Sequence, residues 1–227
     1  MIKESGSISI HAENIFPIIK KWLYSDKDIF VRELISNGTD AVNKLQRLIS
    51  IGEADIPSDE KYEIIVRFNK EQKTIKFIDN GIGMTKEEIK KYINQVAYSG
   101  ARDFLEKYKD KVGEDADIIG HFGLGFYSAF MVSEKVEIDT LSWQPEAKPV
   151  KWISEEGTEF EITESEKSTR GTTITLYMDD DSVEFLNKYK LRNIIEKHCS
   201  FLPVEIYLED EEGPGEKDDE VDDKEER

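Results

Sequence analysis

Several residue types are scarce in this chain of 227 residues. It has one cysteine, Cys199, so it cannot form an internal disulfide, which favours a reducing compartment. No apolar run approaches membrane-spanning length, and the N-terminus carries no signal-peptide pattern. Lys and Arg number 31 against 49 Asp and Glu, giving a net charge of −18 and no basic stripe to attract phosphates. We therefore expect a soluble cytoplasmic protein that binds neither nucleic acid nor membrane.

The negative charge is concentrated at the C-terminal end. Residues 209–227 contain twelve acids and three bases, which is half of the net charge, and few apolar residues. Such a segment does not bury enough apolar surface to fold. We predict a folded domain over residues 1–208 and an acidic, disordered linker over residues 209–227 that leads to a further domain of a longer protein.

The rest of the chain has enough apolar residues for a core, with 38% hydrophobic and 10% aromatic residues. Clustered strands flanked by helices predict an α+β fold, rather than alternating βαβ units. Two strands joined by a short polar turn predict a hairpin, and capping boxes are expected to open two helices. The pattern predicts strands over residues 62–68, 73–79, 135–142, 150–154, 159–163, 172–177 and 204–208, a short strand or arm over 7–11, capping boxes at 25–28 and 85–88, and further helices over 126–132, 182–189 and 191–198.

The most informative stretch lies in a long helical pattern. Apolar residues recur at spacings of three and four over residues 29–49, which predicts one amphipathic helix. On it Glu33, Asn37 and Asp40 project along a single stripe. A carboxylate can accept a proton from water, and an amide oxygen is a good ligand for Mg²⁺. A solvated polar face is the alternative explanation for the stripe.

Residues 79–84 (DNGIGM) follow a predicted strand and precede a capped helix. Asp79 at the strand end can accept a hydrogen bond from an exocyclic amine, and Gly81 and Gly83 let the backbone approach a flat ring closely. An ordinary Asp-Asn-Gly turn is the alternative.

Residues 120–126 (GHFGLGF) lead into an apolar helix. The glycines free backbone amides to bind an anion at a helix N-terminus. The spacing is neither that of a Walker motif nor that of a dinucleotide fingerprint, and a hinge without ligand is the alternative. Residues 170–173 (RGTT) open a strand, where a hydroxyl could support the carboxylate of Asp79.

Together these motifs, in this order, resemble the ATP-binding superfamily shared by gyrase B, heat-shock protein 90, histidine kinases and MutL. Residues 32–37 (RELISN), 79–85 (DNGIGMT) and 123–128 (GLGFYS) resemble the bacterial type of heat-shock protein 90 in particular. The resemblance spans roughly residues 8–208. It implies a Bergerat-type ATP-binding fold, which is a two-layer sandwich with a mostly antiparallel mixed sheet of about eight strands, covered on one face by helices.

The resemblance also implies roles for individual residues. Glu33 would be the general base that activates water, with Arg32 pairing with it in the open state, and Asn37 would bind Mg²⁺. Asp79 would accept the adenine amino proton, supported by Thr172 and Gly83. The remaining nucleotide contacts would come from Asp40, Lys44, Met84, Ile93, Gly120, His121, Phe122, Gly123, Leu124, Gly125 and Phe126.

A lid over residues 99–125 would close on bound ATP. The sequence departs from the family at Tyr92, where a polar residue such as Asn is usual, and at Arg102, where the family has a lysine at the lid start. His121 stands where Gln is usual, and only its backbone is expected to matter. The sequence therefore departs most from the family pattern where the lid would contact the nucleotide.

The implied function is that of a chaperone ATPase domain that binds ATP and ADP with Mg²⁺. Closed lids, a homodimer and an arginine from the next domain would complete the active state, so the isolated domain should be a weak ATPase. Client proteins would bind mostly through other domains. The alternatives are a gyrase B- or MutL-like ATPase acting on DNA, which the acidic composition disfavours, a histidine kinase catalytic domain, and a module that only binds nucleotide.

Overall fold

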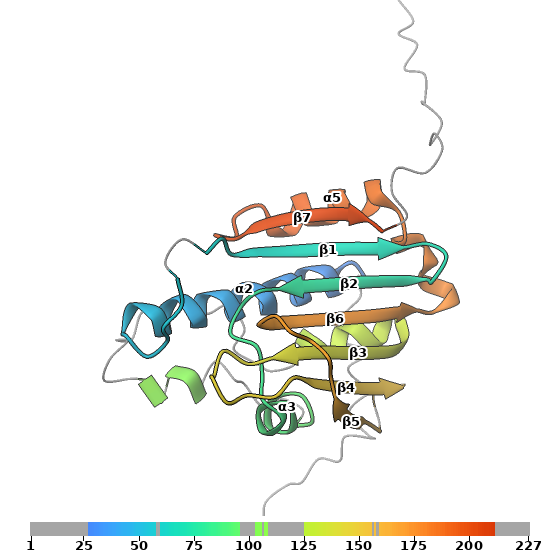
Figure 1. The fold of residues 1–227 in the computed structure, drawn as a ribbon. Coiled ribbons are helices and arrows are strands. Elements are labelled where there is room, and N and C mark those ends of the chain that lie inside the picture. Colours follow the sequence, from blue (N-terminus) through green and yellow to red (C-terminus); the bar gives the residue numbers. More distant parts are fainter. Residues whose placement is uncertain are drawn as a thin grey trace, which may run out of the picture.

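The computed structural model describes residues 27–57, 60–95, 103–105, 107–108, 125–155, 157 and 159–211. This part forms one mixed sheet with helices packed on one side (Figure 1). The strand order is β5-β4-β3-β6-β2-β1-β7, and all neighbouring pairs are antiparallel except β1 with β7. The strands are β1 (Glu63–Asn69), β2 (Thr74–Asp79), β3 (Ser133–Leu141), β4 (Val150–Glu155), β5 (Glu161–Glu164), β6 (Gly171–Met178) and β7 (Glu205–Asp210).

The α-helices α2 (Ile29–Ser50) and α5 (Lys188–Cys199) and the 3-10 helix η2 (Gly125–Met131) cover the inner face of the sheet. The long helix α2 crosses behind the centre of the sheet (Figure 1). The helical elements are α2 (Ile29–Ser50), α3 (Lys86–Tyr92), the 3-10 helices η2 (Gly125–Met131) and η3 (Asp180–Phe185), and α5 (Lys188–Cys199). Helix α5 begins at Asn187, whose side chain accepts a hydrogen bond from the backbone N–H of Lys190 at 3.0 Å. None of the helices in these described ranges has both the length and the apolar composition needed to cross a membrane.

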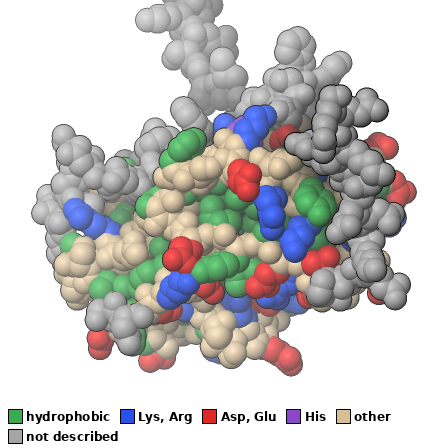
Figure 2. Space-filling model, turned by 90° about the horizontal axis from the view of Figure 1, so that it is seen from above, with side chains coloured by type: hydrophobic (Ala, Val, Ile, Leu, Met, Phe, Trp, Pro, Cys, Tyr) green, Lys and Arg blue, Asp and Glu red, His purple; other side chains and the backbone are tan. Residues whose placement is uncertain are grey.

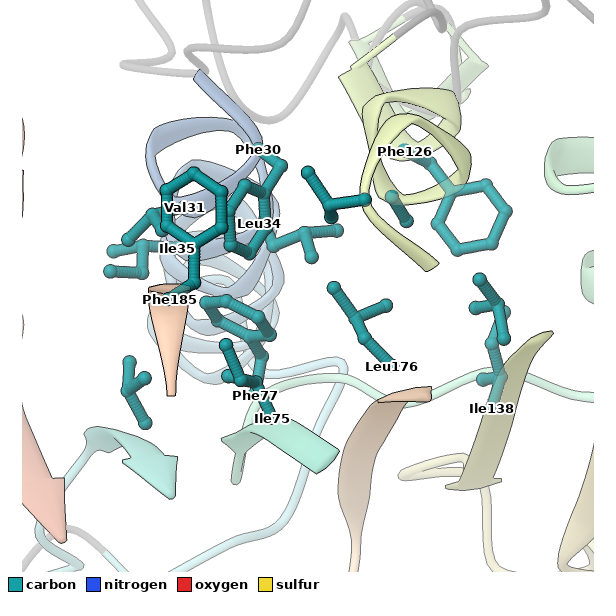
Figure 3. Close-up of a cluster of buried hydrophobic side chains, with 14 of the residues drawn as sticks. Phe30, Val31, Leu34, Ile35, Ile75, Phe77, Phe126, Ile138, Leu176 and Phe185 are labelled. Atoms are coloured by element: carbon teal, nitrogen blue, oxygen red, sulfur yellow. The ribbon is translucent and has the colours of Figure 1, made fainter. Parts of the chain in front are cut away.

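The main core lies between the sheet and α2. Phe30 of α2 is fully buried and meets Phe77 of β2 and Phe185 of η3 edge-on, with ring centroids 6.1 and 5.1 Å away (Figure 3). Each such side chain contributes about 1.5–3 kcal/mol by leaving water. Alternation along β2 places Ile75, Phe77 and Asp79 on this inner face, so the periodicity that builds the core also turns Asp79 toward α2.

The α+β, two-layer architecture is confirmed, with seven strands in the described residues against about eight expected. The remaining expected strand, residues 7–11, lies outside them. The predicted hairpin is confirmed, because β1 and β2 pair antiparallel from Ile64 with Asp79 to Asn69 with Thr74. The capping box at α3 is confirmed as well, because Thr85 and Glu88 exchange the two expected hydrogen bonds.

One predicted helix start and the type of two predicted helices differ from the structure. Helix α2 begins after Asp28, which makes no side-chain capping bond, so a box formed by residues 25–28 does not open it. With the cap at Asp28, the third helical position is Val31, which offers no reciprocal carboxylate. The segments expected as helices near residues 126–132 and 182–189 are the short 3-10 helices η2 and η3.

The last strand continues past the predicted domain boundary at residue 208. Strand β7 ends at Asp210, and the backbone N–H of Glu211 donates to Phe68 O at 3.0 Å. Arg67 pairs with Glu209 at 2.7 Å, and Lys76 pairs with Glu211 at 2.8 Å. These cations on β1 and β2 bind the first acidic residues of the tail where they join the sheet.

Basic and acidic side chains are interspersed over the face seen in Figure 2, with apolar side chains between them. Within the described residues on this face, lysine and arginine do not form a continuous stripe.

Candidate functional site

Helix α2 carries a polar stripe beside its apolar face. Glu33 lies near the N-terminal end of the helix, and its side chain is 23% exposed. Arg32 donates to Glu33 Oε1 from Nη2 at 2.6 Å and from Nε at 3.2 Å. Asn37, one turn further along, is half-buried. The arrangement presents a carboxylate held by a guanidinium, followed by a neutral amide.

The stripe continues toward the middle of the helix with Asp40 and Lys44. Asp40 is buried, with 5% of its surface exposed. Burial lowers the pKa of Lys44, and the carboxylates of Asp40 and Glu88 act in the opposite direction. The helix therefore places a second carboxylate and a desolvated amine beyond Asn37.

Asp79 is the last residue of β2 and faces the helix layer with 9% of its surface exposed. Burial raises the pKa of this carboxyl to about 7. Backbone N–H groups of Gly81 and Thr172, and the charges of Lys167 and Arg170, oppose this shift without offsetting it. The Gly81 N–H lies 2.9 Å from Asp79 Oδ1. A carboxyl in this state is a strong, dry hydrogen-bond acceptor once it ionises.

Two small residues let the end of β2 and the following loop approach α2. A Cβ on Gly38 of α2 would lie 3.5 Å from Asp79 Cβ, in ordinary contact. A Cβ on Gly81 would lie 2.6 Å from the backbone carbon of Ala41, closer than real Cβ atoms come. Ile82 N–H donates to Ala41 O at 3.0 Å. Asp79 is thus brought against the helix turn that follows Asn37.

Hydroxyl groups support the same strand end. Thr140 Oγ1 accepts the Met84 N–H at 3.0 Å, lies 3.0 Å from Thr172 Oγ1, and can donate to Gly171 O at 3.2 Å. Sequence reasoning found Thr172 but missed Thr140. The available signal was that Thr140 occupies an inward position of β3, in phase with its apolar residues. Its place opposite Thr172 follows only from the pairing of β3 with β6.

Gly83 has a left-handed backbone with φ +62°, and a Cβ there would lie 1.9 Å from Leu141 O. Only glycine fits this position, so the chain passes closely between β3 and the start of α3. Met84, which follows it, is partly buried against the core. This close approach gives the loop over residues 79–83 a fixed path.

The end of the glycine-rich segment meets the helix carboxylate. A Cβ on Gly125 would lie 2.3 Å from Glu33 Oε2, so η2 begins directly against Glu33. Phe126 is buried and contacts Trp152 edge-on, at 5.8 Å between centroids. Ile93 packs at the edge of the core, and its carbonyl accepts the Tyr127 hydroxyl. Of the predicted phosphate loop, Gly120, His121, Phe122, Gly123 and Leu124 lie outside the described residues.

Tyr92 is half-buried at the end of α3, and its hydroxyl lies 3.3 Å from Asp103 Oδ2. Lys91 forms an ion pair with the same carboxylate. The unusual tyrosine is therefore linked to a residue inside the predicted lid. Arg102, the other departure, and most of the lid over residues 99–125 lie outside the described residues.

Within the described part of the chain, no three His, Cys, Asp or Glu side chains gather as metal ligands. A hollow of about 410 Å³ lies at the end of β2, and its lining includes Asp79 and Asn80 together with Glu60, Glu63, Ile65, Ile78, Lys167, Thr169 and Arg170. It does not involve the α2 stripe. On the helix side, Asp79 and Gly81 lie close to Gly38 and Ala41 of α2, and Gly125 lies close to Glu33. Gly83, Met84 and Thr172 join the same strand end through Leu141 and Thr140 of β3.

Comparison with known proteins identifies the family of this chain. The family model described as "Histidine kinase-, DNA gyrase B-, and HSP90-like ATPase" matches residues 25–178. "Chaperone protein HtpG" of Bacteroides thetaiotaomicron is 53% identical over 203 residues, covering 89% of this chain and 29% of that protein. The proteins of the same name from Porphyromonas gingivalis and Polaromonas naphthalenivorans are 46% and 37% identical, covering 90% and 93% of this chain and 29% and 34% of theirs.

The chain thus spans about 29% of the length of the first of these relatives. The matched range contains α2, the loop over residues 79–83, η2 and Thr172, which are the elements that meet at the candidate site. The relatives described above, which match about nine-tenths of the chain, are named as HtpG chaperones. The chain belongs to the family of histidine kinase-, DNA gyrase B- and HSP90-like ATPases.

Proposed function

We propose that this chain is the ATP-binding and ATP-hydrolysing domain of a molecular chaperone. The observation that supports this most directly is the buried residue Asp79, whose Cβ lies 3.5 Å from where a Cβ on Gly38 would stand, on the same helix that carries Glu33 and Asn37. A nucleotide has an amine at one end and phosphates at the other, and it needs this kind of polarised site.

At the base end, Asp79 accepts a proton of the adenine amine. Its raised pKa means that the carboxylate is poorly solvated, so a hydrogen bond to it is strong. Thr172 and the backbone of Gly83 hold the same edge of the base. Met84 and Ile93, which pack partly buried against the core, and the buried Phe126 line the pocket around the ring.

At the phosphate end, Glu33 acts as the general base and orients the attacking water. In the conformation seen here, Arg32 pairs with the Glu33 carboxylate. Asn37 would supply one oxygen to Mg²⁺. A single protein ligand fits this ion, which keeps several waters and binds substrate phosphates. Asp40 and Lys44 lie further along the stripe. The glycine-rich loop over residues 120–126 binds phosphates through backbone amides, as part of a lid over residues 99–125.

In the full protein, Mg²⁺-ATP binding closes the lid and favours a homodimer, and an arginine from the following domain completes the catalytic site. Client proteins bind mainly to other domains of the full protein. The chaperone acts in the cytoplasm as part of a stress response. The isolated chain should therefore bind ATP and ADP but hydrolyse ATP slowly.

The test is to replace Glu33 with alanine in a protein long enough to hydrolyse ATP. Loss of a general base affects the transition state, so turnover should fall about 100-fold or more while nucleotide affinity changes little. Glu87→Ala on α3, an exposed acid, is the control. Equal losses of binding and turnover in Glu33→Ala would contradict the assignment of the base.

Release of inorganic phosphate without a phosphohistidine separates this function from that of a histidine kinase. A DNA-acting ATPase like gyrase B or MutL would respond to added DNA, whereas this acidic domain should not. Hydrolysis that is unchanged by DNA, and a protein that stays unlabelled by the γ-phosphate, are the expected results.

A further inference from the structure

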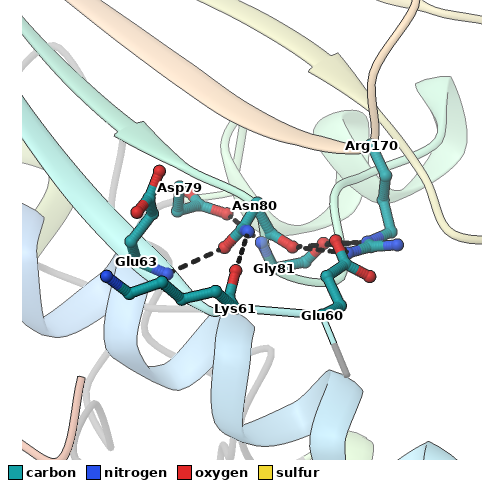
Figure 4. A network of polar contacts seen from close by, with 7 residues as sticks. All are labelled: Glu60, Lys61, Glu63, Asp79, Asn80, Gly81 and Arg170. Atoms are coloured by element: carbon teal, nitrogen blue, oxygen red, sulfur yellow. Dashed lines mark hydrogen bonds and ion pairs between the residues drawn. The ribbon is translucent and has the colours of Figure 1, made fainter. Parts of the chain in front are cut away.

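The loop over residues 79–83 is held from the open side of the sheet by Arg170, the residue before β6. Its Nε donates to Gly81 O at 3.0 Å, and its Nη2 donates to Asn80 O at 2.9 Å (Figure 4). The same Nη2 contacts Glu60 Oε1 at 2.5 Å. The guanidinium, only 17% exposed, thus binds two consecutive loop carbonyls and a carboxylate with a single rigid fork.

The side chain of Asn80 extends this contact to the segment before β1. Asn80 Oδ1 accepts the Glu63 N–H at 3.1 Å, and Asn80 Nδ2 donates to Lys61 O at 2.7 Å (Figure 4). Both polar ends of the amide are therefore used. We call the set of Arg170, Asn80, Glu60 and the backbone of residues 61–63 the outer bracket.

The outer bracket acts on the atoms that orient Asp79. The Gly81 N–H binds Asp79 Oδ1, and Arg170 binds the carbonyl oxygen of the same Gly81. On the inner side, Gly81 presses against Ala41 of α2. The loop is thus fixed between the helix and the guanidinium. A shift of Gly81 away from α2 would carry with it the donor that sets the direction of the carboxylate.

We propose that Arg170, acting with Asn80, is a positioning residue that sets the selectivity of the site for a base with an exocyclic amine. This deepens the proposed function and rests on it. Arg170 itself does not touch the nucleotide. It holds the loop so that the Asp79 carboxylate meets the amine in a single direction, and the discrimination against bases without that amine depends on this direction.

An ordinary structural role is the competing explanation, and the sheet contains a matched example. Arg67 on β1 binds Glu209 of β7 through Nε at 2.8 Å and Nη2 at 2.7 Å. It lies on the same open face and, like Arg170, binds a glutamate, but it bonds no carbonyl of the loop. Loss of Arg67 should cost stability without changing base selectivity.

The experiment compares Arg170→Met with Arg67→Met in the present chain. Dissociation constants for ATP and for inosine triphosphate, which has a carbonyl in place of the amine, are measured by calorimetry, and stability is measured by urea unfolding. In Arg170→Met, ATP affinity should fall about tenfold and inosine triphosphate affinity less than about threefold. In Arg67→Met, both affinities should stay within about twofold of wild type.

Two further variants keep the test decisive if Arg170→Met does not fold. Arg170→Lys keeps the charge but not the fork, and should recover only part of the selectivity. Glu60→Gln removes the negative partner of the fork, and should lower the preference for ATP by about twofold to threefold. An unchanged ratio of the two affinities in the folded Arg170 variants, or an equal change in Arg67→Met, would overturn the proposal. Wild-type protein that binds no ATP would instead refute the proposed function.

Discussion

Replacing Asp79 with asparagine should abolish nucleotide binding and yet stabilise the unliganded domain at neutral and basic pH. The pKa of this carboxyl rises from 3.8 to about 7 because it is buried. Below about pH 4 the carboxyl is protonated in both the folded and the unfolded state, so its burial costs no stability. As the pH rises from about 4 to about 7 it ionises in the unfolded state only, and the folded state loses stability. Asparagine keeps the shape and stays neutral throughout.

The size of the effect follows from the shift. A change of about three pKa units corresponds to roughly 4 kcal/mol of lost stability above pH 7. The amide recovers this cost but gives up one acceptor that faces backbone N–H groups, which costs about 1–3 kcal/mol. The variant should be more stable than wild type by roughly 2 kcal/mol at pH 8, or about 5 °C in Tm for a domain of this size.

The assay is urea unfolding of both proteins between about pH 5.5 and pH 8. The difference in unfolding free energy should grow by about 2 kcal/mol in favour of the variant across this range, a figure that does not depend on the constant cost of the amide. Asp181→Asn, at an exposed position of η3, serves as the control. Parallel pH profiles for wild type and Asp79→Asn would refute the argument that burial dominates this carboxyl. Retained ATP affinity would refute its role in binding the base.

Three other substitutions test the geometry of the site. Gly83→Ala places a Cβ 1.9 Å from a backbone carbonyl oxygen of β3 and should cost several kcal/mol in urea unfolding, whereas Gly52→Ala, equally left-handed but with nothing within 4 Å, should cost only about 1 kcal/mol. Gly125→Ala places a Cβ 2.3 Å from the carboxylate of Glu33 and should reduce ATP turnover about tenfold while ADP affinity stays within about threefold. Thr140→Val removes a hydroxyl that accepts a buried backbone N–H and should lower stability by about 1–3 kcal/mol and weaken ATP binding; unchanged affinity would show that this hydroxyl does not support the base site.

Periodicity along the chain was enough to predict the sheet hairpin, the long helix and the stripe of Glu33 and Asn37, because each of these depends on residues close in sequence. The inward direction of Asp79 follows from the alternation of β2 in the same way. The part that was not predicted depends on contacts between distant segments. Thr140 is an unremarked residue until β3 pairs with β6 and places it opposite Thr172.

The end of the sheet shows the same limit. Composition alone predicts that the acidic residues after position 208 stay unfolded. Arg67 on β1 and Lys76 on β2 bind Glu209 and Glu211, and the strand continues to Asp210. Whether an acidic segment joins the sheet depends on the charges around it as well as on its own charge. Here the strand order β2-β1-β7 determines which cations lie near it.

The placement of Asp79 explains why a site of this kind needs a rigid support. A desolvated carboxylate lowers the stability of the unliganded fold, and a mobile loop would relieve this cost by turning the group into water. Asp79 belongs to β2, which is paired on both sides by β1 and β6, and its loop is pressed between α2 and Arg170. The acceptor therefore stays unsolvated until an amine reaches it, and the free energy lost in the unliganded state becomes available for recognising the base.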